Sequence, residues 1–237
     1  MQFIRRTTSG FSRGLRRTAR GLTRRMGYEV SRIQPFQLSE KLVFSQIPGW
    51  FSQKEAELLY LLGFMSRGRV LEIGHFLGRS TSAICQGIRD SGRSVEFNSY
   101  DIGIASEEEL LAFYTKLYND LEWKDYPRDI YNEWVYAKKA SVTELAKANL
   151  AKYNLDKHVN LHKGDFSELD HTRYDLIFCD AMHDAHEIKH NLPLLLGVSQ
   201  SICTLAFHDM IPAAIESVLA SAPVKFITRA DSLARVS

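Results

Sequence analysis

The segment of the sequence with the clearest chemical potential is VLEIGHFLGRST, residues 70–81. A short apolar stretch carries the acid Glu72, and two glycines, Gly74 and Gly78, precede the hydroxyl of Ser80. A strand, a glycine turn and a helix start let a ligand approach the backbone closely, and the free N–H groups of the new helix face its anionic part. The segment therefore predicts a binding turn for a small ligand.

The glycine spacing excludes two common ligand classes. A dinucleotide site has GxGxxG, in which the middle glycine admits the pyrophosphate. Here the spacing is GxxxG, with the bulky side chains of His75, Phe76 and Leu77 between the glycines. No GxxxxGK[ST] occurs, so a P-loop is also excluded.

The same segment resembles the first motif of class I S-adenosylmethionine-dependent methyltransferases, in the small-molecule O-methyltransferase-like branch with ExGxxxGxS. The resemblance implies that Glu72 accepts hydrogen bonds from the methionine ammonium of the cofactor, directly or through water. It also implies that Gly74 and Gly78 shape the loop and that Ser80 lies near the cofactor's carboxylate. The alternative is an ordinary strand-to-helix turn with a structural acid.

Two further acids follow strand-like segments. Asp101 comes after 95–100, where a carboxylate can accept from both ribose hydroxyls of a nucleotide, although an acid there can also be a turn former. Asp165 in HKGD is similar to the family's GD motif. That resemblance implies that Asp165 caps the adenine amino group and that Phe166 flanks the ring.

The acceptor side is predicted at two strand ends, which we expect to meet at the carboxyl edge of the sheet. DAMH, beginning at Asp180, resembles the family's DGDH, and AFHD, with His208 and Asp209, resembles its strand ending in HD. His183 is the candidate general base because imidazole titrates near neutrality, and Asp180 is the second catalytic candidate. The alternative for His183 is a hydrogen-bonded residue at the rim.

The same strand ends hold the candidate metal ligands. Relatives that use magnesium have acids at these positions, which points to Asp180 and Asp209, with His208 beside them. Magnesium prefers oxygen ligands, so the histidine suits it poorly. Hydrogen-bonded structural groups are the competing interpretation.

Strands alternate with helices along the chain, which implies an α/β fold with a parallel sheet covered on both faces. A capping box at Ser52 and Glu55 begins the first helix. Strands are expected at 69–73, 95–100, 159–162, 176–179 and 202–207, and helices at 80–89, 143–153 and 185–196. The resemblance implies a doubly wound, mostly parallel, seven-stranded Rossmann-like methyltransferase sheet, closed by a hairpin from 224–236.

The sequence predicts an N-terminal arm over 1–38 and a methyltransferase domain over 39–237, with a helical insertion at about 103–140. The arm is basic and amphipathic: nine arginines face one acid within its first 32 residues. It could be a solvated arm, a helix that contacts an anionic membrane or a partner, or a targeting peptide. The insertion is rich in aromatic residues and could be a structural insert or a substrate lid.

Composition narrows the remaining choices. At 237 residues with 45% hydrophobic and 24% charged residues, the chain suits one globular core. Three scattered cysteines suggest neither disulfides nor zinc, and no apolar run approaches the roughly 20 residues of a membrane span. We expect a cytoplasmic protein, with the arm as a candidate for peripheral membrane contact, and no nucleic-acid partner because the rest of the chain is mildly acidic.

The sequence thus predicts methyl transfer from S-adenosylmethionine to a small-molecule acceptor, with a hydroxyl as the favoured acceptor group and magnesium as an optional cofactor. The alternative is a non-catalytic or partner-regulating protein that retains the fold, since a fold does not guarantee an activity.

Overall fold

The computed structural model describes residues 41–118, 128–165, 168–169, 172–181, 185–208, 227–230 and 233–236. All of them belong to the compact unit Glu40–Ser237. The arm predicted over 1–38 lies outside the described residues. None of the described helices is long and apolar enough to cross a membrane.

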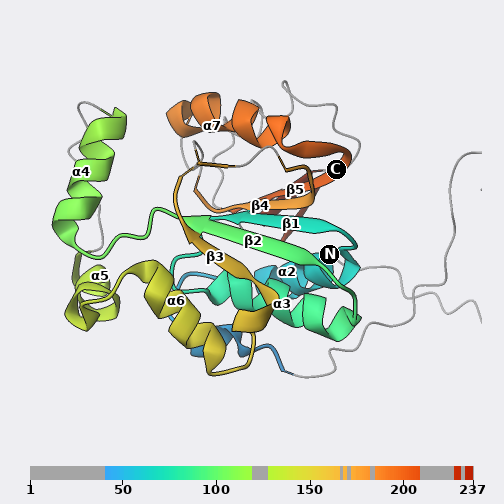
Figure 1. The fold of residues 1–237 in the computed structure, drawn as a ribbon, viewed down its shortest axis with the longest axis horizontal. Coiled ribbons are helices and arrows are strands. Elements are labelled where there is room, and N and C mark those ends of the chain that lie inside the picture. Colours follow the sequence, from blue (N-terminus) through green and yellow to red (C-terminus); the bar gives the residue numbers. More distant parts are fainter. Residues whose placement is uncertain are drawn as a thin grey trace, which may run out of the picture. The chain divides into compact units, whose positions relative to one another are not determined.

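A seven-stranded sheet organises this unit (Figure 1). Its order is β3-β2-β1-β4-β5-β7-β6. The strands β3, β2, β1, β4 and β5 run parallel to one another, and β7 is antiparallel to both β5 and β6. The predicted α/β fold with a mostly parallel Rossmann-like sheet is confirmed. The strands are β1 (Arg69–Ile73), β2 (Glu96–Asp101), β3 (Asn160–Lys163), β4 (Tyr174–Cys179), β5 (Ser199–Phe207), β6 (Ile227–Ala230) and β7 (Leu233–Val236).

The strand order reverses between β1 and β4. The chain runs outward from β1 through β2 to β3, then returns to place β4 and β5 on the other side of β1. Open α/β sheets bind ligands outside the carboxyl ends of the strands at such a reversal. The fold therefore directs attention to the loops that follow β1, β2, β4 and β5.

Helices cover both faces of the sheet, with α7 on one side and α2, α3 and α6 on the other (Figure 1). The predicted capping box starts α2: the Ser52 hydroxyl accepts from the Glu55 N–H, and the Glu55 carboxylate accepts from the Ser52 N–H at 2.8 Å. The helices are α2 (Gln53–Met65), α3 (Arg79–Ser91), α6 (Val142–Ala151) and α7 (Ala185–Gly197), with short 3-10 turns η1 (Val43–Gln46) and η3 (Asp156–His158).

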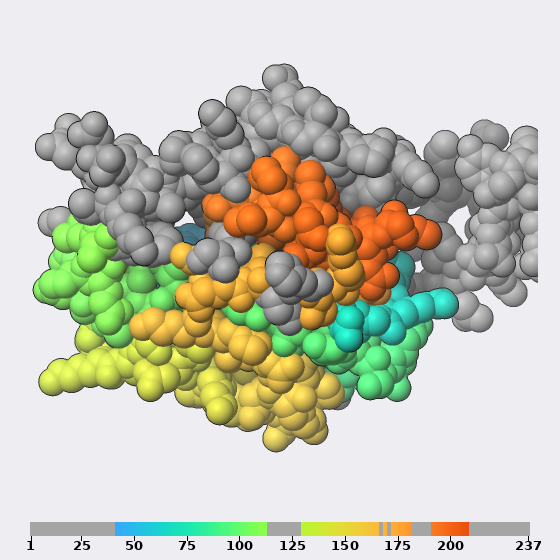
Figure 2. Space-filling model, turned by 45° about the horizontal axis from the view of Figure 1, so that its top comes forward, coloured from blue at the N-terminus to red at the C-terminus, as the bar shows by residue number. Residues whose placement is uncertain are grey.

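The predicted insertion after β2 contains the helices α4 (Glu107–Tyr118) and α5 (Arg128–Trp134) and the 3-10 turn η2 (Tyr136–Lys138). α4 and α5 lie beyond the carboxyl end of β2 (Figure 1). Atoms from the first part of α4 and from α5 gather at one end of the face that Figure 2 shows. The insertion is therefore placed at the sheet edge where a ligand is expected.

Two glycines allow α2 and α3 to pack backbone against backbone. A Cβ atom on Gly63 would lie 2.4 Å from the carbonyl oxygen of Ile84, and one on Gly87 would lie 2.1 Å from that of Tyr60. Neither distance is tolerated, and the obstructing atoms are backbone. The close crossing fixes α3, whose first turn forms part of the candidate site.

We predict that Gly87→Ala lowers the free energy of unfolding by about 2 to 3 kcal/mol, because overpacking forces the two helices apart. Gly197→Ala is the matched control, since a Cβ atom there meets nothing within 4 Å. Denaturant unfolding of the two variants and the parent measures the difference. Equal unfolding midpoints for both variants would show that the helix crossing yields without cost.

Candidate active site

The loop after β1 depends on its two glycines. Gly74 has φ +88°, and a Cβ atom on it would lie 2.5 Å from the carbonyl oxygen of Asp180 at the end of β4. Gly78 also has φ +88° and caps the N-terminus of α3. Both are backbone conformations that favour glycine. Phe76, between them, adopts φ +42° without being a glycine. The loop is thus bent sharply and lies against the end of the neighbouring strand.

Glu72 is fully buried at the centre of this edge, and three hydroxyl groups donate hydrogen bonds to it. Ser80 donates to Oε1 at 2.7 Å, whereas Thr81 and Ser99 donate to Oε2 at 2.7 and 2.6 Å. Burial raises the pKa of Glu72 to about 7, the three hydrogen bonds oppose that rise, and Asp180 adds to it. The side chain is a buried acid that titrates near neutrality.

Sequence reasoning singled out Glu72 and Ser80 but missed the other two hydroxyls. Thr81 follows Ser80 in the first turn of α3, so its position in the sequence could have indicated a second hydroxyl near Glu72. Ser99 pairs with Glu72 in the register of β1 and β2, which only the sheet reveals. The Ser80 hydroxyl proton is directed at Glu72, so its oxygen lone pairs are the part of the group that can meet a ligand.

Asp101 ties the first two strand ends together. Its Oδ2 atom accepts the Phe76 N–H and its Oδ1 atom accepts the Gly103 N–H, both at 2.9 Å. Each oxygen accepts one of these backbone hydrogen bonds, and a carboxylate oxygen can accept more than one. Asp165 is the second residue after β3, and the N–H of Gly164 before it donates to the carbonyl oxygen of Asp101 at 2.8 Å. The structure therefore brings Asp101 and the segment with Asp165 to neighbouring strand ends. Phe166 lies outside the described residues.

Aromatic rings from two other parts of the chain surround Phe76. Trp50 stacks on it with ring centroids 5.6 Å apart, and Tyr131 and Trp134 of α5 lie at 5.2 and 6.4 Å. Trp50 and Trp134 also lie 5.2 Å apart, and Trp50 is 48% exposed. The insertion thus contacts the glycine loop itself. Trp50 was not predicted from the sequence, because only the fold brings it to this loop.

Arg79 holds the segment that carries Trp50. Its guanidinium donates to the carbonyl oxygens of Ile47 at 2.9 Å and Phe51 at 3.1 Å, and it lies 5.0 Å from the centre of the Phe44 ring. Arg79 is the first residue of α3. The segment 44–51 is therefore anchored to the same helix start that carries Ser80.

The ends of β4 and β5 meet, as predicted. His208 Nδ1 lies 2.9 Å from Asp180 Oδ1, and its Nε2 lies 3.6 Å from Oε1 of Glu55 in α2. The imidazole is 4% exposed and stacks on Phe51 with ring centroids 4.3 Å apart. His208 is thus held between two carboxylates and a ring, and it orients Asp180. The sequence predicts Glu55 only as part of a helix cap.

In this structure the two nitrogens of His208 face the carboxylates of Asp180 and Glu55. Within the described part of the chain, no group of three or more His, Cys, Asp or Glu side chains could hold a metal ion. Asp209 and His183 lie outside the described residues. The predicted roles of Asp180, Asp209 and His208 as ligands therefore stay predictions.

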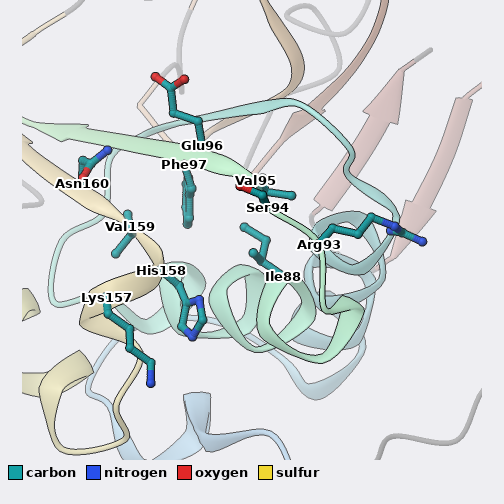
Figure 3. Close-up of a pocket in the computed structure, with 10 residues that line it drawn as sticks. All are labelled: Ile88, Arg93, Ser94, Val95, Glu96, Phe97, Lys157, His158, Val159 and Asn160. Atoms are coloured by element: carbon teal, nitrogen blue, oxygen red, sulfur yellow. The ribbon is translucent and has the colours of Figure 1, made fainter.

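A hollow of about 250 Å³ lies at the opposite end of β2 and β3, near the end of α3 (Figure 3). Two charged side chains of its lining bind elsewhere. Glu96 accepts from Arg69 at 2.9 Å, and Arg93 donates to the carbonyl oxygens of Phe64 and Ser66. In Figure 3 both side chains point away from the space beside Phe97. This hollow is therefore not the candidate active site.

Residues 71–210 match a family described as a methyltransferase domain, and the chain belongs to this family. Solved structures share the fold. They include a SAM-dependent O-methyltransferase from Thermotoga maritima (15% identity, TM-score 0.51, covering 81% of this chain and 58% of that one). A second is cofactor-bound Rv0187 from MTB (16% identity, TM-score 0.51, covering 81% of this chain and 83% of that one). A third is a candidate O-methyltransferase from Klebsiella pneumoniae (14% identity, TM-score 0.50, covering 92% of this chain and 94% of that one). No curated protein sequence matches the chain significantly. This chain spans little more than half of the Thermotoga protein.

Glu72 makes the stability of the protein pH-dependent. Its ordinary pKa is 4.5 and its pKa in the folded protein is about 7, so the folded state binds this proton more tightly than the unfolded chain does. The free energy of unfolding should therefore fall by on the order of 3 kcal/mol as the pH rises from about 4.5 to above about 7. Glu72→Gln, which cannot ionise, should remove this part of the pH dependence. Denaturant unfolding across that range, compared between parent and variant, is the measurement; parallel profiles would contradict the assignment.

Proposed function

We propose that this methyltransferase moves a methyl group from S-adenosylmethionine to a hydroxyl of a small-molecule acceptor. The observation that carries the proposal is the buried Glu72 beneath the glycine loop, with Ser80 in the adjoining first turn of α3 and Asp101 on the same edge. O-methyltransferases among the proteins that share the fold support the choice of acceptor group.

The residues at this edge fit the parts of the cofactor. Glu72 supplies the negative charge for the methionine ammonium. Because the Glu72 carboxylate is fully buried, the ammonium interacts with it through water or through the oxygen of Ser80. Asp101 has lone pairs for the ribose hydroxyls, and Asp165 and Phe166 serve the adenine. Gly74 and Gly78 shape the loop that receives the ligand, and Gly74 keeps it close to β4, since a Cβ atom there would lie 2.5 Å from the carbonyl oxygen of Asp180.

Catalysis then needs few protein groups. S-adenosylmethionine supplies an activated methyl group, and in-line displacement on its sulfonium requires little covalent help. The protein aligns the acceptor, excludes water and removes one proton. We assign the proton removal to His183, with Asp180 as the second catalytic residue, and His208 orients Asp180 through its Nδ1 atom. The aromatic cluster of Trp50, Phe76 and α5 gives the site an apolar wall.

We also propose a cytoplasmic location, with the basic arm as a peripheral contact for anionic membranes. Clustered arginines near such a surface each contribute about 1 kcal/mol of attraction. The nine arginines of the arm, against one acid, support this proposal.

Asp101→Ala should weaken S-adenosylmethionine binding by about tenfold or more, because ligand hydroxyls would lose charged hydrogen-bond partners. Asp175→Ala is the matched control: Asp175 also accepts two backbone N–H groups, from Arg67 and Gly68, but at the other edge of the sheet. Calorimetry on both variants measures the effect, and thermal unfolding checks that each is folded. If Asp101→Ala binds S-adenosylmethionine like Asp175→Ala, the assignment of Asp101 to the ribose is wrong. If the parent itself does not bind S-adenosylmethionine, the result supports the alternative of a non-catalytic protein that retains the fold.

His183→Ala should lower turnover by about 10² to 10⁴, the usual share of a general base, while cofactor affinity stays unchanged. A screen of hydroxylated small molecules for release of S-adenosylhomocysteine identifies the acceptor for this assay. Loss of turnover on chelation, restored by magnesium and reproduced by Asp180→Asn, would instead support the metal alternative. Full turnover of His183→Ala in the presence of chelator would leave alignment as the only catalytic contribution.

A further inference from the structure

A chain of hydrogen bonds joins Glu72 to the start of α6 through two residues without an assigned role. Ser99 Oγ lies 2.6 Å from Glu72 Oε2, His75 Nδ1 lies 3.0 Å from Ser99 Oγ, and His75 Nε2 lies 3.2 Å from Thr143 Oγ1. Glu72 and Ser99 are fully buried, and His75 is 1% exposed. This chain of hydrogen bonds is therefore shielded from water along most of its length.

When Glu72 is ionised, the number of available protons fixes which group donates in each of these hydrogen bonds. An ionised carboxylate only accepts, so Ser99 gives its single hydroxyl proton to Glu72. The Ser99 oxygen is then left to accept, so His75 donates from Nδ1. Burial lowers the pKa of His75 and favours its neutral form, so its Nε2 atom carries no proton and accepts from Thr143. Every donor points toward Glu72.

Protonation of Glu72 removes the reason for this direction. Thr81 and Ser99 both donate to Oε2, so a proton on that atom would point at one of these two hydroxyls. When it points at Ser99, the Ser99 hydroxyl turns toward His75. The aligned dipoles stabilise a negative charge more strongly than a neutral acid, because a charge–dipole interaction exceeds a dipole–dipole one in a buried site. The hydrogen-bond chain therefore favours the ionised form of Glu72.

We propose that His75 is a positioning residue that holds the Ser99 hydroxyl toward Glu72 and so keeps Glu72 in the anionic form that the cofactor's ammonium needs. The proposal rests on the proposed function, since it assumes that Glu72 serves that ammonium. His75 touches neither the cofactor nor the acceptor in this role. It acts only through Ser99.

The pKa of Glu72, raised by burial to about 7, makes such support matter at neutral pH. The other titratable groups facing the chain are Asp180 and Cys85, toward Glu72, and Asp101 and His162, toward His75. Asp180 raises the pKa of Glu72, and burial keeps the Cys85 thiol protonated by raising its pKa well above the usual range. None of these four is altered in the variants below, so a changed pH profile reports on the hydrogen-bond chain.

The test measures binding of S-adenosylhomocysteine as a function of pH in two matched pairs of variants. His75→Leu removes the donor to Ser99, whereas His75→Asn keeps an amide N–H at about the place of Nδ1. Thr143→Val removes the hydroxyl at the far end of the chain, whereas Thr143→Ser keeps it. Ser99→Ala, which removes the direct donor to Glu72, sets the upper limit of the effect.

For the parent, affinity should rise with pH through about 7, as Glu72 ionises. In His75→Leu the midpoint should move upward by about one unit, so that binding at neutral pH weakens about threefold to tenfold and recovers by about pH 9. His75→Asn and Thr143→Ser should follow the parent, and Thr143→Val should shift in the same direction by less. Recovery at high pH is the result that damage to the site would not give.

An unchanged midpoint in His75→Leu, or a loss of affinity that is equal at every pH, would overturn the proposal. If the parent binds no S-adenosylhomocysteine, the proposed function fails instead. The hydrogen-bond chain is then tested on the unliganded protein. There, His75→Leu should raise the pH at which the stability dependence of Glu72 ends, and His75→Asn should not.

Discussion

The fully buried carboxylate of Glu72 is the constraint around which the rest of the site is arranged. An isolated carboxylate is costly to bury, and here the cost is offset by three hydroxyl donors from two different elements, α3 and β2. Because Ser80 and Thr81 occupy the first turn of α3, that helix must begin close to the end of β1. The glycine loop between them is therefore short and bent, with two residues at φ +88°.

The short loop brings three strand ends together. Gly74 packs against the backbone of Asp180, and Asp101 accepts the N–H of Phe76, so that β4, β1 and β2 are tied at one edge. The same edge receives the aromatic cluster, because Phe76 projects toward Trp50 and α5. A buried acid, a tied loop and an apolar wall thus result from one turn of the chain. This combination suits the alignment of a polar cofactor with a small acceptor.

Much of the fold follows from local signals. The alternation of apolar strands with helices, the capping box at Ser52 and the glycine after β1 each act within a few residues, so strand and helix positions could be predicted to within a few residues. The closing antiparallel strands β6 and β7 fall inside the predicted 224–236 segment. The insertion was predicted as helical from its length and composition, but its contact with the glycine loop was not. That contact joins residues far apart in the chain, and periodicity carries no information about such pairs.

By itself the sequence determined the alternation of strands and helices, the position of the glycine loop and the acids that end the strands, because these depend on spacing along the chain. The seven-stranded sheet was expected only from the family resemblance. Only the tertiary structure decided which groups satisfy those acids. Ser99 meets Glu72 through the register of β1 and β2. His75 contacts Thr143, which lies 68 residues away in the sequence, and Glu55 of α2 faces His208 after β5. Buried polar groups must find partners in space rather than in sequence. For that reason the motif residues were visible in advance, whereas the hydrogen bonds that set their charge were not.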